Sequence, residues 1–336
     1  MPSALPSGAM DDSAPTALYE PGDPYDSQWL SVPGGHELFI QQSGSPGGQP
    51  LLLLHGGPGS KATAMQRRLF DPARFRIVQF DQRACGRSRA RAPLLHNHTD
   101  ALVADIERIR DRLGIVRWLV CGGSWGATLA VHYAATHRSP VAGLLLRALF
   151  LAGRTDLDWF FGGAGALFPD EWQRFLACAP RSRRHRIQPW LWQVFAKGGD
   201  ADMRRVAAAW RRWEAVVQGQ TPPPAALDSE AIQRYRIQAH YLARACFLGE
   251  RRVRAAVASL HGLPVLFVHG RRDFVCRPSN AWTAWCSLSG SRLLWVDEAG
   301  HDPFAPGMVR AVREAADRWL REQDFDGIGL LRRPPW

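Results

Sequence analysis

One serine of this chain lies in a setting that suits a nucleophile. Ser124 is the centre of segment 122–126, Gly-Gly-Ser-Trp-Gly, which follows the apolar run 118–121 and leads into the helix-like stretch 127–135. A serine hydroxyl is a weak nucleophile, so it needs a base, and a strained strand-to-helix turn lifts it to where a base can reach it. The glycines two positions before and after it let neighbouring backbone pass close to the turn. In this context the pattern predicts a nucleophile elbow with Ser124 as the attacking group.

A serine nucleophile also requires a histidine base and an acid that orients the base. His301 follows the apolar run 292–296, and Asp273 follows the run 264–268, so both lie in loops just past expected strands. Asp297 is the alternative acid, but it is close to the histidine in sequence and is better suited to shaping that loop. We therefore predict Asp273 and His301 as the partners of the serine, in the chain order serine, aspartate, histidine.

A second glycine-rich strand end supplies groups that would stabilise negative charge. Segment 55–59, His-Gly-Gly-Pro-Gly, comes directly after the apolar run 51–54. Its backbone N–H groups can approach an anion without an obstructing Cβ, and the residue after the nucleophile offers a further N–H at the start of a helix. Gly57 and Trp125 are the predicted oxyanion hole, in which each donor is typically worth about 3–4 kcal/mol of transition-state stabilisation.

These motifs lie on an alternation of strand-like and helix-like segments. Apolar runs typical of strands occupy 37–40, 51–54, 75–80, 118–121, 142–146, 264–268 and 292–296. The later runs are continuous, as expected for strands that are buried on both faces of a parallel sheet. Helix-like patterns lie at 99–113, 124–137, 278–288 and 308–320. The sequence therefore predicts an α/β fold with a mostly parallel sheet that helices cover on both faces.

The alternation stops in the middle of the chain. Residues 150–259 contain no convincing strand, are rich in tryptophan and show helical spacing. We interpret this stretch as an all-helical lid inserted between two strands, which divides the catalytic domain into 31–149 and 260–336. Residues 1–30 are rich in Pro, Ser, Asp and Gly, and we predict that they form an N-terminal extension.

Composition limits the classes of protein. The 336 residues are 46% hydrophobic and 22% charged, and they contain no signal-peptide-like segment and no run long enough to span a membrane. We therefore expect a cytoplasmic protein without a membrane partner. The net charge is +11, but lysine occurs only at positions 61 and 197 and no nucleic-acid motif accompanies the arginines, so no nucleic-acid partner is expected. The six cysteines are scattered, which argues against a disulfide framework and against a metal site.

Over most of its length the chain resembles the prolyl aminopeptidases, also called proline iminopeptidases, which have the α/β-hydrolase fold. The resemblance rests on the serine elbow and on segments 55–59, 81–88 (Asp-Gln-Arg-Ala-Cys-Gly-Arg-Ser), 270–273 (Gly-Arg-Arg-Asp) and 300–301 (Gly-His). It implies the removal of an N-terminal proline from a peptide substrate with a free N-terminus, without a metal or a cofactor. It also implies the same catalytic triad that the residues themselves suggest.

The resemblance also assigns residues that would hold the substrate. A free cationic N-terminus is bound best by carboxylates, and Glu214, in Trp-Arg-Arg-Trp-Glu, matches the first acidic position of the family. By similarity Arg147 belongs to the same polar corner. Phe150, Phe160 and Cys276 match positions that enclose the pyrrolidine ring of proline.

One departure from the family concerns the second acidic position. Where the family usually has Glu-Asn-His-Tyr-Phe, this chain has Gln-Ala-His-Tyr-Leu at 238–242. Gln238 still accepts a hydrogen bond but carries no charge, and Leu242 keeps an apolar wall without the aromatic ring. Since a hydrogen bond to a charged group is worth about 1.5–3 kcal/mol, we expect hydrolysis to survive while the selectivity for proline is loosened.

Two alternative functions remain open. An esterase or amidase with the same fold and lid, acting on a small hydrophobic substrate, would share the triad but would not need Glu214. A non-catalytic binding protein of this fold would require a defective triad, and no defect is visible in the sequence. The sequence specifies no oligomeric state.

Overall fold

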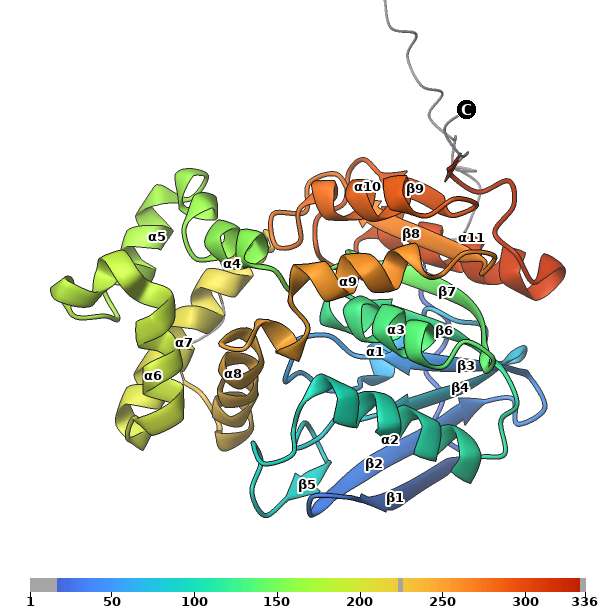
Figure 1. The fold of residues 1–336 in the computed structure, drawn as a ribbon, viewed down its shortest axis with the longest axis horizontal. Helices are drawn as coiled ribbons and strands as arrows, with labels where there is room; N and C mark the ends of the chain where they lie inside the picture. Colours follow the sequence, from blue (N-terminus) through green and yellow to red (C-terminus); the bar gives the residue numbers. More distant parts are fainter. Residues whose placement is uncertain (1–16, 223–225, 333–336) are drawn as a thin grey trace, which may run out of the picture.

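The strands that the structure describes form one sheet (Figure 1). The computed structural model describes residues 17–222 and 226–332. The strands are β1 (Asp26–Val32), β2 (His36–Gly44), β3 (Gln49–Leu54), β4 (Phe75–Phe80), β5 (Arg89–Ala90), β6 (Trp118–Gly123), β7 (Val141–Arg147), β8 (Val265–Gly270), β9 (Arg292–Val296) and β10 (Leu330–Leu331). Their order across the sheet is β1-β2-β4-β3-β6-β7-β8-β9-β10, with β5 paired to β2.

The centre of the sheet is parallel and its margins are antiparallel. Every pairing from β4 through β3, β6, β7 and β8 to β9 is parallel. The pairings of β2 with β1 and β4, and of β10 with β9, are antiparallel. Because parallel strands all end at the same edge, the loops after β3, β6, β8 and β9 come together there. That edge is where the predicted catalytic residues belong.

Successive residues of the central strands enter two separate apolar cores. On β8, Val265 and Phe267 belong to one core, whereas Leu266 and Val268 belong to the other. Burial on both faces explains the unbroken apolar runs of the sequence. The first core is closed by α2 (Thr99–Arg112), α3 (Trp125–Thr136), α9 (Gly249–Ala258) and α10 (Pro278–Ser287), and the second by α11 (Pro306–Glu322). Within the described ranges, no helix is both long and apolar enough to cross a membrane.

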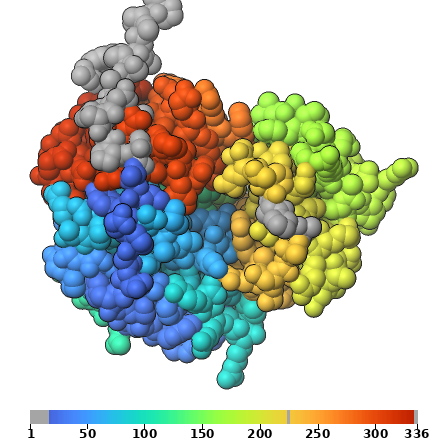
Figure 2. Space-filling view, turned by 180° about the vertical axis from the view of Figure 1, so that it is seen from behind, coloured from blue at the N-terminus to red at the C-terminus, as the bar shows by residue number. Residues whose placement is uncertain are grey.

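Between β7 and β8 the chain leaves the sheet and forms a group of helices, called the lid below. These helices are α4 (Arg154–Phe160), α5 (Pro169–Leu176), α6 (Ile187–Lys197), α7 (Asp200–Val217) and α8 (Ser229–Leu242). They lie beyond one end of the sheet in Figure 1 and form a separate, green-to-yellow lobe in Figure 2. The lid has an aromatic interior, in which the rings of Phe161, Trp192 and Trp210 lie 5.2 to 5.9 Å apart. Aromatic pairs of this kind stabilise the packing between its helices.

The predicted α/β architecture is confirmed, but two boundaries differ from the expectation. Strand β1 begins at Asp26, inside the stretch 1–30 that was expected to be an extension, and it pairs with β2 along its whole length. Residues 1–16 lie outside the described residues. Helix α9 falls within 150–259, which was assigned to the lid, yet it packs against α3 and α10 over the sheet. Both elements therefore belong to the sheet domain.

Candidate active site

Ser124 lies on the tight turn between β6 and α3. Its backbone angles are φ 57° and ψ −124°, a left-handed conformation that residues with side chains rarely adopt and that functional sites often retain. Small neighbours make the turn possible. A Cβ on Gly122 would lie 2.3 Å from the carbonyl oxygen of Gly126, and a Cβ on Gly126 would lie 2.4 Å from the carbonyl oxygen of Leu54. The elbow is thus pressed against the end of β3.

The loop after β3 is tied to the elbow through a histidine and a glutamine. The Nε2 of His55 accepts the backbone N–H of Gln82 at 3.0 Å, so its Nδ1 carries the proton and donates to the carbonyl of Gly56 at 3.0 Å. Burial lowers the pKa of His55, which keeps the ring neutral. The Gln82 side chain donates to the carbonyl of His55 and accepts from the indole N–H of Trp125, both at 2.9 Å. These bonds hold the loop against the start of α3.

The two predicted oxyanion donors belong to the two segments that these bonds join, the loop after β3 and the start of α3. Gly57 lines the same cavity as Ser124. Trp125 is the first residue of α3, where backbone N–H groups have no partner within the helix. The indole of Trp125 is fully buried and bonded to Gln82, so its backbone N–H is the group that can face an anion. Their action as an oxyanion hole stays a prediction.

Asp273 and His301 meet in the loops after β8 and β9. The Nδ1 of His301 donates to Oδ2 of Asp273 at 2.8 Å, while Oδ1 accepts the backbone N–H groups of Val275 and Cys276, both at 2.9 Å. Burial alone would raise the pKa of Asp273, but His301, His269 and Arg147 outweigh it and hold this pKa below its ordinary value. An ionised Asp273 keeps the proton on Nδ1 and leaves Nε2 as the base. The alternative acid, Asp297, instead forms an exposed ion pair with an arginine at 2.6 Å.

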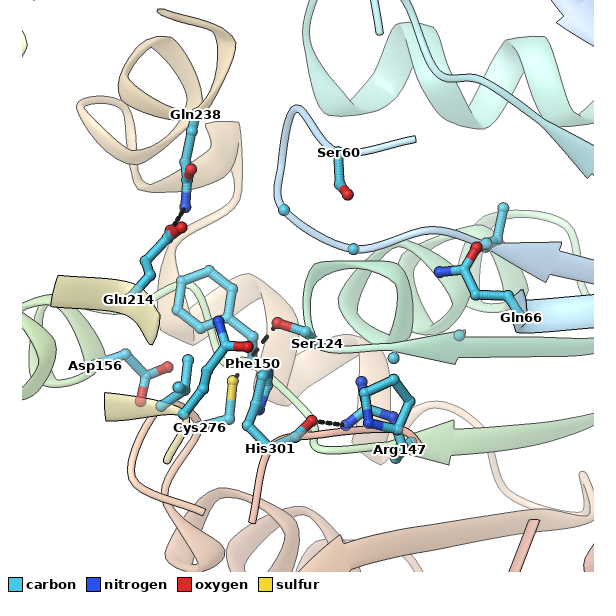
Figure 3. Close-up of a pocket in the computed structure, with 18 of the residues that line it drawn as sticks. Ser60, Gln66, Ser124, Arg147, Phe150, Asp156, Glu214, Gln238, Cys276 and His301 are labelled. Carbon is cyan, nitrogen blue, oxygen red and sulfur yellow. Dashed lines mark hydrogen bonds between the residues drawn. The ribbon is translucent and has the colours of Figure 1, made fainter. Parts of the chain in front are cut away.

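Ser124 and His301 line one cavity (Figure 3). The Oγ of Ser124 lies 3.8 Å from the Sγ of Cys276, and in the described part of the chain no direct hydrogen bond joins the serine and histidine side chains. Hydrogen bonds between catalytic groups are often long without substrate and shorten when it binds. The structure therefore brings the predicted nucleophile, base and acid to one edge of the sheet.

Arg147 is the last residue of β7 and contacts the loop after β9 that contains His301. Its Nη1 donates to the backbone carbonyl of His301 at 2.7 Å. Its guanidinium also lies against Gly123 at the end of β6. A Cβ on Gly123 would lie only 2.7 Å from Nη2. Figure 3 shows Arg147 and Glu214 on opposite sides of Ser124. Arg147 lines the same cavity as Glu214, and its role in the polar corner that the resemblance suggested stays a prediction.

Glu214 and Gln238 meet across two helices of the lid. The amide Nε2 of Gln238, on α8, donates to Oε1 of Glu214, on α7, at 2.8 Å, and both residues line the cavity (Figure 3). Each residue is 7% exposed. The second carboxylate oxygen, Oε2, accepts from the Nη2 of Arg234 at 3.0 Å and from the hydroxyl of Tyr235 at 2.7 Å. Glu214 is therefore a buried carboxylate with three donors of the protein around it.

Apolar side chains surround the space between the serine and this polar pair. The cavity has a volume of about 240 Å³, which is smaller than the roughly 300–1,000 Å³ of sites for larger small molecules. It is lined by the side chains that the resemblance assigned to the proline ring and its surroundings, Phe150, Phe160, Leu242 and Cys276. Burial raises the pKa of Cys276 well above its ordinary value, so a neutral thiol faces the serine. The space suits one small acyl group.

Two charged residues of the cavity were not expected from the sequence. Asp156, on α4, is buried, and its oxygens accept the side-chain amide of Asn280 and the backbone N–H of Leu151, both at 2.9 Å; burial raises its pKa. Arg234 lies one helical turn before Gln238 and therefore on the same face of α8. That spacing was the available signal for Arg234, whereas nothing in the sequence around Asp156 singles it out.

Thiols and other metal-ligating side chains are dispersed over the molecule. The six cysteines, at positions 85, 121, 178, 246, 276 and 286, are free, and all but Cys286 are buried. Over residues 17–222 and 226–332, no three His, Cys, Asp or Glu side chains gather in a way that could hold a metal ion.

Comparison with known proteins adds the family to this geometry. A family model described as alpha/beta hydrolase fold matches residues 49–307. A probable proline iminopeptidase from Leptolyngbya boryana is 36% identical over 315 residues, which cover 91% of this chain and 98% of the relative. The chain belongs to the proline iminopeptidase family. The family resemblance predicted from the motifs is thereby confirmed.

Further relatives and solved structures agree with this assignment. The proline iminopeptidase of Xylella fastidiosa is 37% identical over 310 residues, covering 90% of this chain and 99% of its own. That of Arabidopsis thaliana is 37% identical over 299 residues, covering 87% and 79%. Among solved structures, an esterase from Exiguobacterium antarcticum has a TM-score of 0.61 at 18% identity, covering 88% of this chain and all of its own. At that identity the likeness concerns the fold alone, and it agrees with the predicted α/β-hydrolase fold.

Proposed function

We propose that this proline iminopeptidase family member is a serine aminopeptidase that releases an N-terminal residue, preferably proline, from peptides with a free N-terminus. The observation that carries the proposal is the joint lining of one small cavity by Ser124 and His301 on the sheet domain and by Glu214 and Gln238 on the lid. An aminopeptidase needs catalytic residues at the scissile bond. It also needs a closed end of the cavity, one substrate residue from that bond, that accepts the N-terminal amine. The relatives named proline iminopeptidases support proline as the preferred residue.

The chemistry follows from these positions. Ser124 Oγ attacks the carbonyl carbon of the N-terminal residue while Nε2 of His301 takes the hydroxyl proton, and the backbone N–H groups of Gly57 and Trp125 stabilise the oxyanion. When the intermediate collapses, the C–N bond breaks and His301 gives its proton to the leaving amine. Water then attacks the ester on Ser124 with His301 as the base, which releases the free residue and restores the serine. Asp273 holds the histidine in position through both halves of the reaction.

Gln238 reduces the negative charge that the lid offers to the substrate. Its amide donates to Glu214 at 2.8 Å instead of adding a second carboxylate. A hydrogen bond to a charged group is worth about 1.5–3 kcal/mol, and this corresponds to roughly one to two decades in affinity. We therefore propose that the selectivity for a free prolyl group is looser here than in relatives with the family's usual glutamate.

A panel of chromogenic substrates tests both parts of the proposal. The rates for prolyl, alanyl and N-acetylprolyl p-nitroanilides are compared with the rate for a simple p-nitrophenyl ester, with Ser124→Ala as the background. We expect cleavage of the prolyl and alanyl anilides at rates within about two decades of each other and no cleavage of the blocked anilide. Strong preference for the prolyl anilide would defeat the loosened selectivity. Cleavage of blocked anilides or esters alone would defeat the aminopeptidase itself.

An esterase or amidase acting on a small hydrophobic substrate is the second candidate. It is favoured by the pairing of Glu214 with Arg234 at 3.0 Å, because a compensated carboxylate attracts a cationic amine less. Glu214→Ala separates the two functions, since it should cripple cleavage of prolyl anilide but scarcely affect a neutral ester. Glu171→Ala is the matched control, because that carboxylate binds Arg212 at 2.7 Å elsewhere on the lid. Equal loss of anilide and ester cleavage in the Glu214 variant would count against the aminopeptidase.

We also propose that the protein works in a reducing compartment, the cytoplasm. All six cysteines are free, and free thiols are typical of proteins that are not exposed to an oxidising environment. Fractionation of the source cells should recover the prolyl-anilide activity with the cytoplasm. Recovery from the medium or from a membrane fraction would contradict this part of the proposal.

A further inference from the structure

The carboxylate at the lid end of the cavity is compensated within the protein. Both oxygens of Glu214 accept hydrogen bonds from α8, from Gln238 at 2.8 Å, Tyr235 at 2.7 Å and Arg234 at 3.0 Å. The last of these is an ion pair, so the two formal charges cancel. Arg211, on α7, adds a further positive charge near Tyr235. A substrate that reaches Glu214 therefore meets a carboxylate whose charge has already been balanced.

The other charges around the cavity are balanced as well. Asp156 faces Arg277 with 3.6 Å between the charged atoms. Asp273 and Arg147 interact as opposite charges, and both are hydrogen-bonded to His301. Tyr235 stays neutral, because burial raises its pKa well above the ordinary value. Among the residues that the structure describes, every acid that lines or supports the cavity thus has a cation close to it.

The side chain of Gln238 leaves one buried acceptor without a partner. A carboxylate only accepts hydrogen bonds, so the amide nitrogen of Gln238 must face Glu214 and its carbonyl oxygen is turned elsewhere. This oxygen, Oε1, is buried and has no hydrogen-bond partner in a residue that is 7% exposed and lines the cavity. Leaving a buried acceptor unpaired is costly. A ligand that brings an N–H group to Oε1 is therefore favoured.

We propose that Arg234 and Gln238 together make this subsite electrically neutral, so that the chain binds the N-terminal imino group of its substrate in the uncharged form. This inference rests on the proposed aminopeptidase function and specifies the ionisation state that the enzyme takes. A protonated imino group that enters a buried, charge-balanced site loses its hydration without gaining a counter-charge. The uncharged imino group of proline keeps one N–H, which matches the single free acceptor of Gln238. Arg234 and Gln238 are then specificity residues for the amine.

The proposal has a definite consequence for pH dependence. An α-amino group titrates at about 7.7–8.0, so its uncharged fraction falls about 40-fold between pH 8 and pH 6. Ionisations of the free enzyme also enter kcat/KM, so their contribution has to be removed from the measurement. A second substrate with the same scissile bond but no amine provides that correction.

The test compares prolyl p-nitroanilide with cyclopentanecarbonyl p-nitroanilide, in which a CH₂ group replaces the ring N–H. Since kcat/KM reports the free enzyme and the free substrate, the ratio of the two kcat/KM values isolates the amine. We expect this ratio to rise about 40-fold from pH 6 to pH 8 and to level off above the substrate's pKa. A ratio that is constant or falls with pH overturns the proposal and leaves the aminopeptidase intact. Cleavage of the cyclopentane substrate without any cleavage of the prolyl substrate overturns the proposed function instead.

Two variants assign the effect to the residues named. Gln238→Glu adds a carboxylate beside Glu214, and Arg234→Gln removes the compensating cation. Each should raise the ratio at pH 6 by at least about tenfold and flatten its pH profile, as expected when the cationic form becomes acceptable. Arg212→Gln, which removes one of the two arginines paired with Glu171 on the lid, is the control and should keep the wild-type profile. Cleavage of the cyclopentane substrate reports correct folding, and unchanged ratios in the folded variants overturn the proposal.

Discussion

Replacing Gly126 with alanine tests how closely the elbow depends on strand β3. The added Cβ would lie 2.4 Å from the carbonyl oxygen of Leu54 and 3.0 Å from that of His55. Both are backbone atoms, so no side-chain rotation relieves the contact. An ordinary contact begins at 3.4 Å, so the start of α3 and the end of β3 must separate by about 1 Å. A displacement of that size at a catalytic group can cost about 10²-fold in rate.

The displacement separates the two predicted oxyanion donors, Gly57 and Trp125. Losing one such donor costs about 2.7–4 kcal/mol, or roughly 10²–10³ in kcat. We expect Gly126→Ala to lower kcat on prolyl p-nitroanilide by that factor with little change in KM, because the amine-binding residues lie on the lid. Gly47→Ala is the control, since nothing lies within 4 Å of its added methyl group. A folded Gly126→Ala enzyme with wild-type kcat would refute the reasoning.

Two further predictions concern buried carboxylates. Asp105→Ala removes a buried ion pair with Arg83, in which the hydrogen bonds are 2.6 and 2.9 Å long, and should lower the free energy of unfolding measured in urea by about 3–5 kcal/mol. The control, Asp158→Ala, breaks an exposed pair with Arg154 and should lower it by less than about 1 kcal/mol. Equal losses in the two variants would contradict the prediction. Asp273→Asn should lower kcat by about 10⁴-fold. Because the pKa of Asp273 is held below its ordinary value, its ionised form stabilises the fold above about pH 3.9, and this stabilisation is lost as the pH falls further. The free energy of unfolding of Asp273→Asn should therefore decline less steeply in acid than that of the wild-type protein.

The positions of the proposed catalytic residues could be predicted because they depend on short-range patterns and one topological rule. Ser124, Asp273 and His301 each follow an apolar run, and the carboxyl ends of parallel strands meet at one edge of the sheet. Glycines at fixed offsets marked the elbow and the loop before Gly57. These signals are local in the sequence, so no knowledge of the tertiary packing was needed.

The features that the sequence did not predict depend on packing between distant segments. The pair of Glu214 and Arg234 joins α7 to α8, so its existence depends on how two helices of the lid are set against each other. The contact of Arg147 with the carbonyl of His301 joins the ends of β7 and β9 across β8. Strand β1 was missed because it lies at the margin of the sheet, where its side chains alternate between partly buried and exposed positions instead of forming an apolar run.

In the proposed mechanism the substrate's acyl group is bonded to Ser124 during turnover. Identifying the residue that carries this acyl group is the most direct test of the mechanism. A prolyl p-nitrophenyl ester is mixed with the enzyme, quenched in acid during the burst and digested, and the acylated peptide is identified by mass spectrometry. We predict one prolyl group on the peptide that contains Ser124, and none in Ser124→Ala. A prolyl group on Cys276, whose Sγ lies 3.8 Å from the serine Oγ, or turnover without an acylated peptide, would contradict the account.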